Sequence, residues 1–311
     1  MTLSPGVKSF RVGNYIFLGL LALVTAYPFW FIIQASFTDP LHRISYFWPK
    51  GFFTLNYFLI FTGGPMKLAT GIGRAYMITI LRVLIAVPLM LAITGSAAFA
   101  LTRKELKGRK VIITYYFITM FVSGGLVPFY MLLKAIGLLN TFWVFVIPTV
   151  FSVWSMIVMK TSFQGLPEGL VEAGLLDGAS YGRIFFRIIL PLSLPMIATI
   201  GLFQAVWHWN DWFYGSFYVR EQNLRPLQTF VRMVVTAGYL ADKLFEQINQ
   251  QLYLNPDRFS DDPAVLDEYR KITAMSLKLT YIVVSTLPVL VLYPFLQKYF
   301  IKGVLIGSVK E

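Results

Sequence analysis

Apolar residues dominate six long stretches of the chain, and polar or charged residues gather between them. A helix needs about 20 residues to cross about 30 Å of hydrocarbon, and each stretch reaches that length. The pattern predicts six membrane-spanning helices, at about 12–34, 75–101, 111–133, 141–162, 190–213 and 275–300. The first stretch follows Lys8 and Arg11 and has no cleavage site of small residues after it, so we interpret it as a retained helix.

Two longer segments separate the predicted spans, at about 35–74 and 214–274. The first contains Trp48-Pro49-Lys50-Gly51 and Thr62-Gly63-Gly64-Pro65, combinations that favour turns and a folded loop. The second has a turn-rich centre, with Asn255-Pro256-Asp257 and Asp262-Pro263, between flanks that can be helical. Whether this second segment is a solvated connector or docks a partner stays open. The whole chain, 1–311, is interpreted as one membrane domain.

Composition supports a membrane protein. Of the 311 residues 57% are hydrophobic and 14% are charged, and the mean hydropathy is +0.65, which is too apolar for one soluble core. The absence of cysteine excludes disulfides and thiolate metal sites, and His42 and His208 are the only histidines. We therefore expect no metal site, and no nucleophile, base or metal cluster of an enzyme is apparent.

The distribution of basic residues predicts the orientation. The loop 103–110 carries five cations in eight residues, and the tails add Lys8, Arg11, Lys302 and Lys310. If six helices alternate, all of these lie on one side, which the positive-inside rule assigns to the cytoplasm together with both termini. The net charge of +12 is then a topology signal, and we expect no nucleic-acid partner.

The segment 164–191, between the fourth and fifth spans, has the punctuation of two short helices. Pro167 suits a first helical turn, and Gly178 suits the break after it. Ser180 can cap a second helix that must end near Leu190, because Pro191 and Pro195 follow. A short apolar stripe beside Glu172 suits a groove on another protein; a helix resting on lipid is the alternative.

The run Glu172-Ala173-Gly174-Leu175-Leu176-Asp177-Gly178-Ala179, with Leu190-Pro191 downstream, resembles the EAA loop of permease subunits of bacterial ATP-binding-cassette (ABC) importers. The third position is usually Ala in that family and is Gly174 here, a change that lowers helix propensity by about 1 kcal/mol. Further segments resemble the carbohydrate-uptake branch, with its six-span maltose-type permease subunit: Ala98 to Arg103 with Gly108-Arg109, Val127 to Tyr130, Gly137 to Thr141, Trp209 to Trp212, and Gln297 to Gly303.

The resemblance implies an all-α membrane protein with the type I ABC importer permease architecture and a cytoplasmic EAA coupling loop at 164–191. It implies that Glu172 enters a cleft of an ATPase subunit, that Gly178 forms the turn and that Asp177 braces it. The remaining residues of this candidate coupling site are Ala173, Gly174, Ala179 and Pro191. No Gly-Lys dipeptide occurs in the chain, so a phosphate-binding loop is absent, and ATP and Mg would be bound by partner subunits.

The resemblance also implies partners and a location. The partners are a sister permease subunit in a heterodimer, two ATPase subunits, an extracytoplasmic solute-binding protein, a carbohydrate and membrane lipid. The location is the bacterial cytoplasmic membrane, crossed several times. The family members that the chain is most similar to import complex oligosaccharides, including fragments of pectic and alginate-like acidic polymers. The sugar itself, and whether this subunit or its sister contributes the main substrate contacts, stay open.

A candidate substrate path lies in the fifth span, where aromatic and polar residues mix. The candidates are His208, Trp209, Asn210 and Asp211, because sugars offer C–H faces to aromatic rings and hydroxyls to amides and carboxylates. The alternative is an aromatic belt at the membrane interface. We expect Arg82 to lie at the interface too, since Val83 to Leu101 could span alone.

An ion-coupled secondary sugar transporter is the alternative function. Such a protein would place acids or broken helices near the middle of the membrane. Only Asp211 comes near to such a place, and it lies towards the end of its span. The pattern therefore favours the ATP-driven importer.

Overall fold

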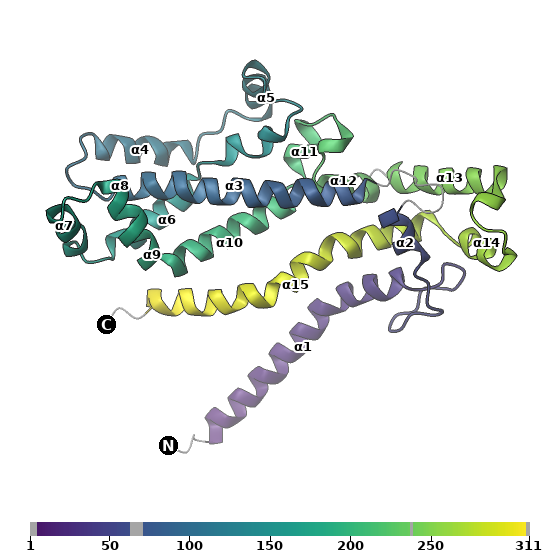
Figure 1. Cartoon of the computed structure of the whole chain (residues 1–311). Helices are drawn as coiled ribbons and strands as arrows, with labels where there is room; N and C mark the ends of the chain where they lie inside the picture. The colour runs from purple at the N-terminus through teal and green to yellow at the C-terminus, as the bar shows by residue number, and fades with distance from the viewer. Residues whose placement is uncertain (1–4, 63–70, 237–238, 309–311) are drawn as a thin grey trace. The chain divides into compact units, whose positions relative to one another are not determined.

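The computed structural model describes residues 5–62, 71–236 and 239–308, and the regular structure within them is helical (Figure 1). The one extended contact in these ranges is an isolated antiparallel bridge between Thr38 and Phe52. This confirms the all-α fold class.

The chain divides into two compact units at Thr70/Gly71, Phe230/Val231 and Leu287/Pro288. Unit 1 contains the N-terminal part and residues 231–287, and unit 2 contains residues 71–230 and the C-terminal part.

Three helices in the described ranges are long and apolar enough to cross a membrane. They are α1 (Pro5–Ser36), α3 (Ile72–Ala100) and α15 (Ala274–Ser308). Two bent pairs raise the number to five if each is one span. One pair is Phe142–Thr149 with Val153–Gln164, bent by 44°, and the other is Tyr181–Leu192 with Leu194–Phe217, bent by 85°. The count of six spans stays a prediction.

The stretch predicted as a third span, 111–133, is interrupted. It forms α4 (Arg109–Thr119) and α5 (Leu126–Ala135), with no helix over 121–125. Gly125 has φ +78° there, a conformation that glycine adopts readily. Hydropathy alone does not report such a break, because Gly and the residues around it keep the window apolar.

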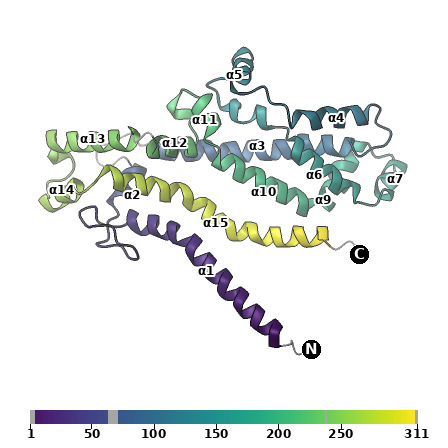
Figure 2. The same ribbon diagram turned by 180° about the vertical axis from the view of Figure 1, so that it is seen from behind.

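The centre of unit 2 is α3, which packs against α6 (Val153–Gln164) and α10 (Leu194–Asn210) (Figures 1 and 2). Close approach depends on small residues. A Cβ at Gly201 of α10 would lie 3.0 Å from Leu91 Cδ1 of α3, and one at Gly95 of α3 would lie 3.3 Å from Phe185 Cζ. Met90, Met156 and Met159 fill the buried core between these helices. Glycines therefore allow the backbones to approach, and flexible methionines fill the irregular space.

Shorter helices complete unit 2. Two 3₁₀ turns, η1 (Phe142–Phe145) and η2 (Ile147–Thr149), precede α6. After α6 come α7 (Gly169–Leu176), α8 (Tyr181–Ile184), the π-helix η3 (Phe185–Ile189) and α9 (Leu190–Leu192). After α10 come α11 (Phe213–Phe217), the 3₁₀ turn η4 (Gln222–Leu224) and α12 (Leu227–Val235), which runs on into unit 1.

Unit 1 contains the two predicted outer segments in part. These include α2 (Leu55–Thr62), α13 (Tyr239–Leu254), the 3₁₀ turn η5 (Pro256–Arg258) and α14 (Pro263–Arg270). The predicted helical flanks around Asn255 to Pro263 are confirmed, and Asp262 caps α14 by accepting from Ala264 N at 2.9 Å. The predicted turn at Gly63-Gly64-Pro65 lies outside the described residues. Within unit 1, Lys271 Nζ lies 3.4 Å from Asp39 Oδ2.

Candidate functional site

Helix α7 lies at one end of unit 2 with one face packed and the other open (Figure 1). Val171 and Gly174 are buried, and a Cβ at Gly174 would lie 3.0 Å from Ile184 Cγ1 of α8. Glu172 is exposed, and Leu176 is 89% exposed. The open face of α7 therefore combines an acid with an apolar side chain. Gly174 lets α7 rest closely on α8 while the Glu172 face stays accessible.

The turn between α7 and α8 has the geometry that the sequence predicts. Asp177 follows the last residue of α7, and its N–H donates to Ala173 O at 3.0 Å. Gly178 has φ +74°, and Ala179 N donates back to Gly174 O at 2.9 Å. Ser180 Oγ accepts from Arg183 N at 3.4 Å and caps α8. The order of helix, turn and helix is therefore confirmed; its role in coupling stays a prediction.

The two ends of the helical pair differ slightly from the prediction. Pro167 lies just before α7 rather than in its first turn: the helix begins at Gly169, and Leu170 N closes a separate turn on Pro167 O at 3.2 Å. The second helix continues to Leu192 instead of ending near Leu190. A π-helical turn, η3, precedes Pro191. The helix then passes through Pro191, which contributes no backbone N–H to its hydrogen bonds.

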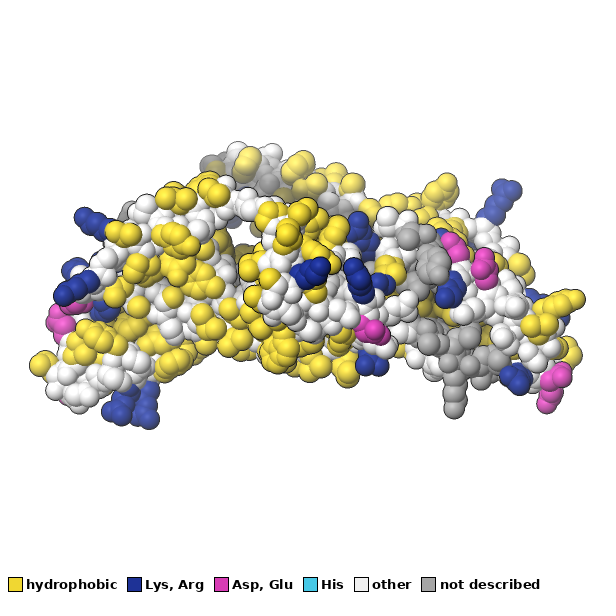
Figure 3. All heavy atoms as spheres, turned by 90° about the horizontal axis from the view of Figure 1, so that it is seen from above, with side chains coloured by type: hydrophobic (Ala, Val, Ile, Leu, Met, Phe, Trp, Pro, Cys, Tyr) yellow, Lys and Arg dark blue, Asp and Glu magenta, His cyan; other side chains and the backbone are white. Residues whose placement is uncertain are grey.

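An ion pair joins the α7 segment to the basic loop 103–110. Lys104 Nζ lies 2.9 Å from Glu168 Oε1, and both side chains are exposed. The hydrogen bond from Lys104 holds the pKa of the Glu168 carboxyl below its usual value. Figure 3 shows basic side chains gathered at this end of unit 2. The basic loop and α7 therefore lie at the same end, which is what the predicted orientation requires.

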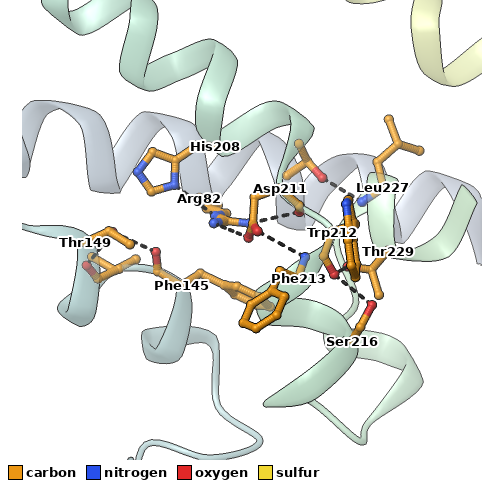
Figure 4. A network of polar contacts seen from close by, with 12 residues as sticks. Arg82, Phe145, Thr149, His208, Asp211, Trp212, Phe213, Ser216, Leu227 and Thr229 are labelled. Carbon is orange, nitrogen blue, oxygen red and sulfur yellow. Dashed lines mark hydrogen bonds and ion pairs between the residues drawn. The ribbon is translucent and has the colours of Figure 1, made fainter. Parts of the chain in front are cut away.

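A second polar cluster lies where α3 passes the end of α10 (Figure 4). The Arg82 side chain is fully buried, and its Nη2 lies 2.7 Å from Asp211 Oδ2. Its Nε donates to His208 Nδ1 at 3.0 Å, and Nη1 donates to the backbone oxygen of Asp211 at 3.4 Å. The structure thus places Arg82 inside unit 2, paired with a carboxylate 129 residues away in the chain. Its expected depth at the membrane interface stays a prediction.

Aromatic rings surround the guanidinium of Arg82. Its Cζ lies 5.0 Å from the centre of the Phe145 ring, 5.7 Å from that of Trp207 and 5.8 Å from that of Tyr214. Asp211 also ends α10, and its Oδ1 accepts from Phe213 N at 3.0 Å, the first residue of α11. The cluster thus fixes the break between α10 and α11 to α3 by charge, hydrogen bonds and cation–π contacts.

The structure separates the four candidate residues of the substrate path. His208 is fully buried against Arg82, and Asp211 is occupied by Arg82 and Phe213. Trp209 is half-buried and packs edge-on against Tyr76, with 6.2 Å between the ring centres. Asn210 is exposed. The four therefore do not form one surface. His208 faces the interior of unit 2, Trp209 packs beside Tyr76 of α3, and Asp211 is engaged by Arg82, while Asn210 is exposed.

Three aromatic residues outside that set lie beside Asn210. Phe203, Trp207 and Trp212 line an open pocket of about 480 Å³ together with Asn210, Val206 and Asp211. Phe203, Trp207 and Asn210 are spaced by four and three residues, which places them on one face of α10. This spacing is the pattern in the sequence that could have indicated the shared face. In the described part of the chain, no three His, Asp or Glu side chains come together as a metal site.

The sequence and fold assign the chain to a family of membrane transport subunits. Residues 8–237 match the family described as "Binding-protein-dependent transport system inner membrane component", and the chain belongs to that family. It is therefore a multi-pass inner-membrane permease subunit of an ABC importer.

Among its relatives, Protein LplC of Bacillus subtilis (strain 168) is 36% identical over 306 residues, which cover 97% of this chain and 95% of LplC. The polygalacturonan/rhamnogalacturonan transport system permease protein YtcP of the same strain is 32% identical over 299 residues, which cover 95% and 96%. A solved structure of a bacterial ABC transporter involved in the import of the acidic polysaccharide alginate contains a chain of the same fold. Its TM-score is 0.79 at 22% identity, and the match covers 96% of this chain and 99% of that one.

Proposed function

We propose that this chain is the permease subunit of an ATP-driven importer of carbohydrate, with oligosaccharides from acidic polymers such as pectin or alginate as its cargo. Support comes from YtcP, whose name specifies polygalacturonan and rhamnogalacturonan. The protein of similar fold belongs to a transporter of alginate. A chain of this kind translocates sugar and carries out no chemistry on it.

The working assembly contains this chain and a sister permease subunit as a heterodimer, two ATPase subunits and an extracytoplasmic solute-binding protein. ATP and Mg are bound by the ATPase subunits. Both termini and α7 lie on the cytoplasmic side, in agreement with the basic loop 103–110 at the same end of unit 2 as α7.

The main structural support for this proposal is the continuous connection from α7 to α10. The open face of α7, with Glu172 and Leu176, docks into a cleft of an ATPase subunit. Its packed face rests on Ile184 of α8 through Gly174. Helical backbone then continues from Tyr181 to Leu192 and, after one bend, into α10. A displacement of α7 by the ATPase is therefore transmitted to a helix at the centre of unit 2.

Charge reversal at Glu172 tests this role. In the importer reconstituted with its binding protein, Glu172→Lys should abolish the ATPase activity stimulated by the sugar-loaded binding protein, because a cation replaces the carboxylate that enters the ATPase cleft. Glu105→Lys is the matched control, since Glu105 is an exposed acid in the basic loop at the same end. It should keep stimulation. Wild-type stimulation in Glu172→Lys would refute the docking role.

Ion-coupled transport by this chain alone has less support. Asp211 is the acid that such a mechanism would use, and its carboxylate lies 2.7 Å from the guanidinium of Arg82. This carboxylate is already engaged by the guanidinium of Arg82 and by Phe213 N, so it serves as a structural contact between α3 and the end of α10. Helix α10 itself offers no substitute, since it carries no acidic residue from Leu194 to Asn210.

A further inference from the structure

The exposed face at the C-terminal end of α10 combines flat aromatic rings with an amide. Phe203, Trp207 and Trp212 are 42%, 45% and 38% exposed, and Asn210 lies between the two tryptophans in sequence and is exposed. Together they line the open pocket of about 480 Å³. That volume falls within the range of about 300–1,000 Å³ typical of small-molecule sites. The pocket is thus lined by three exposed aromatic residues, with the amide of Asn210 among them.

The polar group is held in a fixed orientation. Asn210 Nδ2 donates to Val206 O at 3.0 Å, one helical turn earlier. This bond occupies one amide N–H and directs the rest of the amide away from the helix backbone. The side-chain oxygen is then available to accept from a hydroxyl group, and the second N–H is available to donate to one. Sugar hydroxyls need both functions.

Trp207 is supported from behind by the Arg82 cluster. The guanidinium Cζ lies 5.7 Å from the Trp207 ring centre, and the Tyr214 ring stands edge-on to it at 6.2 Å. These contacts fix the indole while 45% of the residue stays exposed on the side of the pocket. A ring fixed before the ligand arrives loses little conformational entropy on binding.

The pocket also presents no unbalanced charge. Asp211 contributes to its lining, but Oδ2 faces Arg82 and Oδ1 accepts from Phe213 N. The carboxylate is therefore neutralised by a residue that is itself fully buried. An acidic sugar is not repelled by such a site, and a neutral sugar finds the same rings and amide.

We propose that this pocket is a carbohydrate subsite in which a pyranose ring stacks on Trp207 while its hydroxyls bond to the amide of Asn210. Trp212 and Phe203 form its sides. The assignment rests on the proposed function, because it takes the cargo to be a sugar. Compared with the path predicted from the sequence, it adds Trp207 and Trp212 as residues that face the ligand. His208 supports the subsite from inside unit 2, and Asp211 contributes to the lining while it stays paired with Arg82. The lipid and the sister subunit are the other occupants that the experiments must exclude.

Aromatic and aliphatic replacements of Trp207 distinguish stacking from simple apolar contact. Uptake of tetragalacturonate and of maltotetraose is measured with the complete importer in proteoliposomes. Trp207→Leu should lower the uptake rate by about tenfold, while Trp207→Phe should stay within about threefold of wild type, since both keep apolar area but only Phe keeps a ring. Trp143→Leu is the control, because Trp143 is 52% exposed and does not line the pocket. Equal uptake by the Leu and Phe variants would overturn the proposal.

A labelling experiment decides the question even if the Trp207 variants fail to assemble. The chain contains no cysteine, so Asn210→Cys carries a single thiol. In the assembled importer a charged, water-soluble methanethiosulfonate should modify this thiol, and tetragalacturonate delivered by the binding protein should slow the reaction. The wild-type chain is the control without a thiol. No modification in the assembled importer would mean that lipid or the sister subunit covers the face, and modification at an unchanged rate with sugar would also overturn the subsite.

The outcomes separate the subsite from the function on which it rests. If the wild-type importer takes up neither oligosaccharide with ATP and binding protein present, the proposed function fails. If the wild type takes up sugar while Trp207→Leu matches it, the subsite alone is wrong.

Discussion

Replacing Asp211 by Asn should destabilise unit 2 strongly, because it leaves the guanidinium of Arg82 buried without a counter-charge. The two side chains are 0% and 7% exposed, and Nη2 and Oδ2 are 2.7 Å apart. At an effective dielectric constant of about 20, unit charges about 4 Å apart attract each other by about 4 kcal/mol. Removal of one partner of a buried pair costs about 3–5 kcal/mol. We expect Asp211→Asn to lie in that range.

The other neighbours of Arg82 cannot compensate. His208 offers one neutral acceptor at 3.0 Å, and the rings of Phe145, Trp207 and Tyr214 attract the cation less strongly than a carboxylate does. The double variant Arg82→Met with Asp211→Asn removes both charges and fills much of the volume. It should be more stable than the sum of the two single changes predicts, by at least about 1.5 kcal/mol.

The assay is equilibrium unfolding of the purified chain in mixed detergent micelles, for the wild type, both single variants and the double variant. Asp267→Asn is the control, because Asp267 also pairs with an arginine, Arg270, at 2.9 Å but both side chains are largely exposed. Its effect should be much smaller. Equal effects of Asp211→Asn and Asp267→Asn, or an additive double variant, would refute the buried-pair argument.

Three further changes test local parts of the structure. Gly215→Ala should destabilise by about 1–3 kcal/mol, since the new Cβ would overlap Thr229 Oγ1; unfolding midpoints of the two chains decide it. Gly174→Ala should change stability by less than about 1 kcal/mol, because gained helix propensity offsets a contact of 3.0 Å with a flexible side chain of α8; a loss well above that would show that α7 and α8 cannot adjust. Lys104→Met should lower stability slightly at neutral pH and low salt. Since the pKa of Glu168 is lowered in the folded state, the difference should vanish as pH falls through that pKa, and a difference that persists in strong acid would contradict the ion pair.

Local rules predicted the α7–α8 segment well. Gly178 adopts the positive φ that a break after a helix requires, and Ser180 caps the next helix as its side chain allows. Both are decided by interactions within a few residues, so the sequence alone can indicate them. The end of the second helix was less predictable, since the π-helical turn before Pro191 arises from packing of Phe185 and Ile189 in the core of unit 2.

The Arg82 cluster could not be predicted from the sequence because its members are far apart in the chain. No local pattern indicates a partner for Arg82, and Asp211 taken alone is as typical of a substrate path as of an ion pair. Their pairing depends on the packing of α3 against α10, which glycines at positions such as 201 permit. The interruption of the span at 111–133 was missed for a related reason: hydropathy measures composition and does not locate a break in the backbone.

Sugar uptake by the reconstituted importer is the most direct test of the proposed ATP-driven import. Proteoliposomes containing this chain, its sister permease and the ATPase subunits should accumulate tetragalacturonate only with ATP inside and binding protein outside, and Glu172→Lys should abolish the accumulation. Accumulation by this chain alone, driven by a proton or sodium gradient without ATP, would contradict the account.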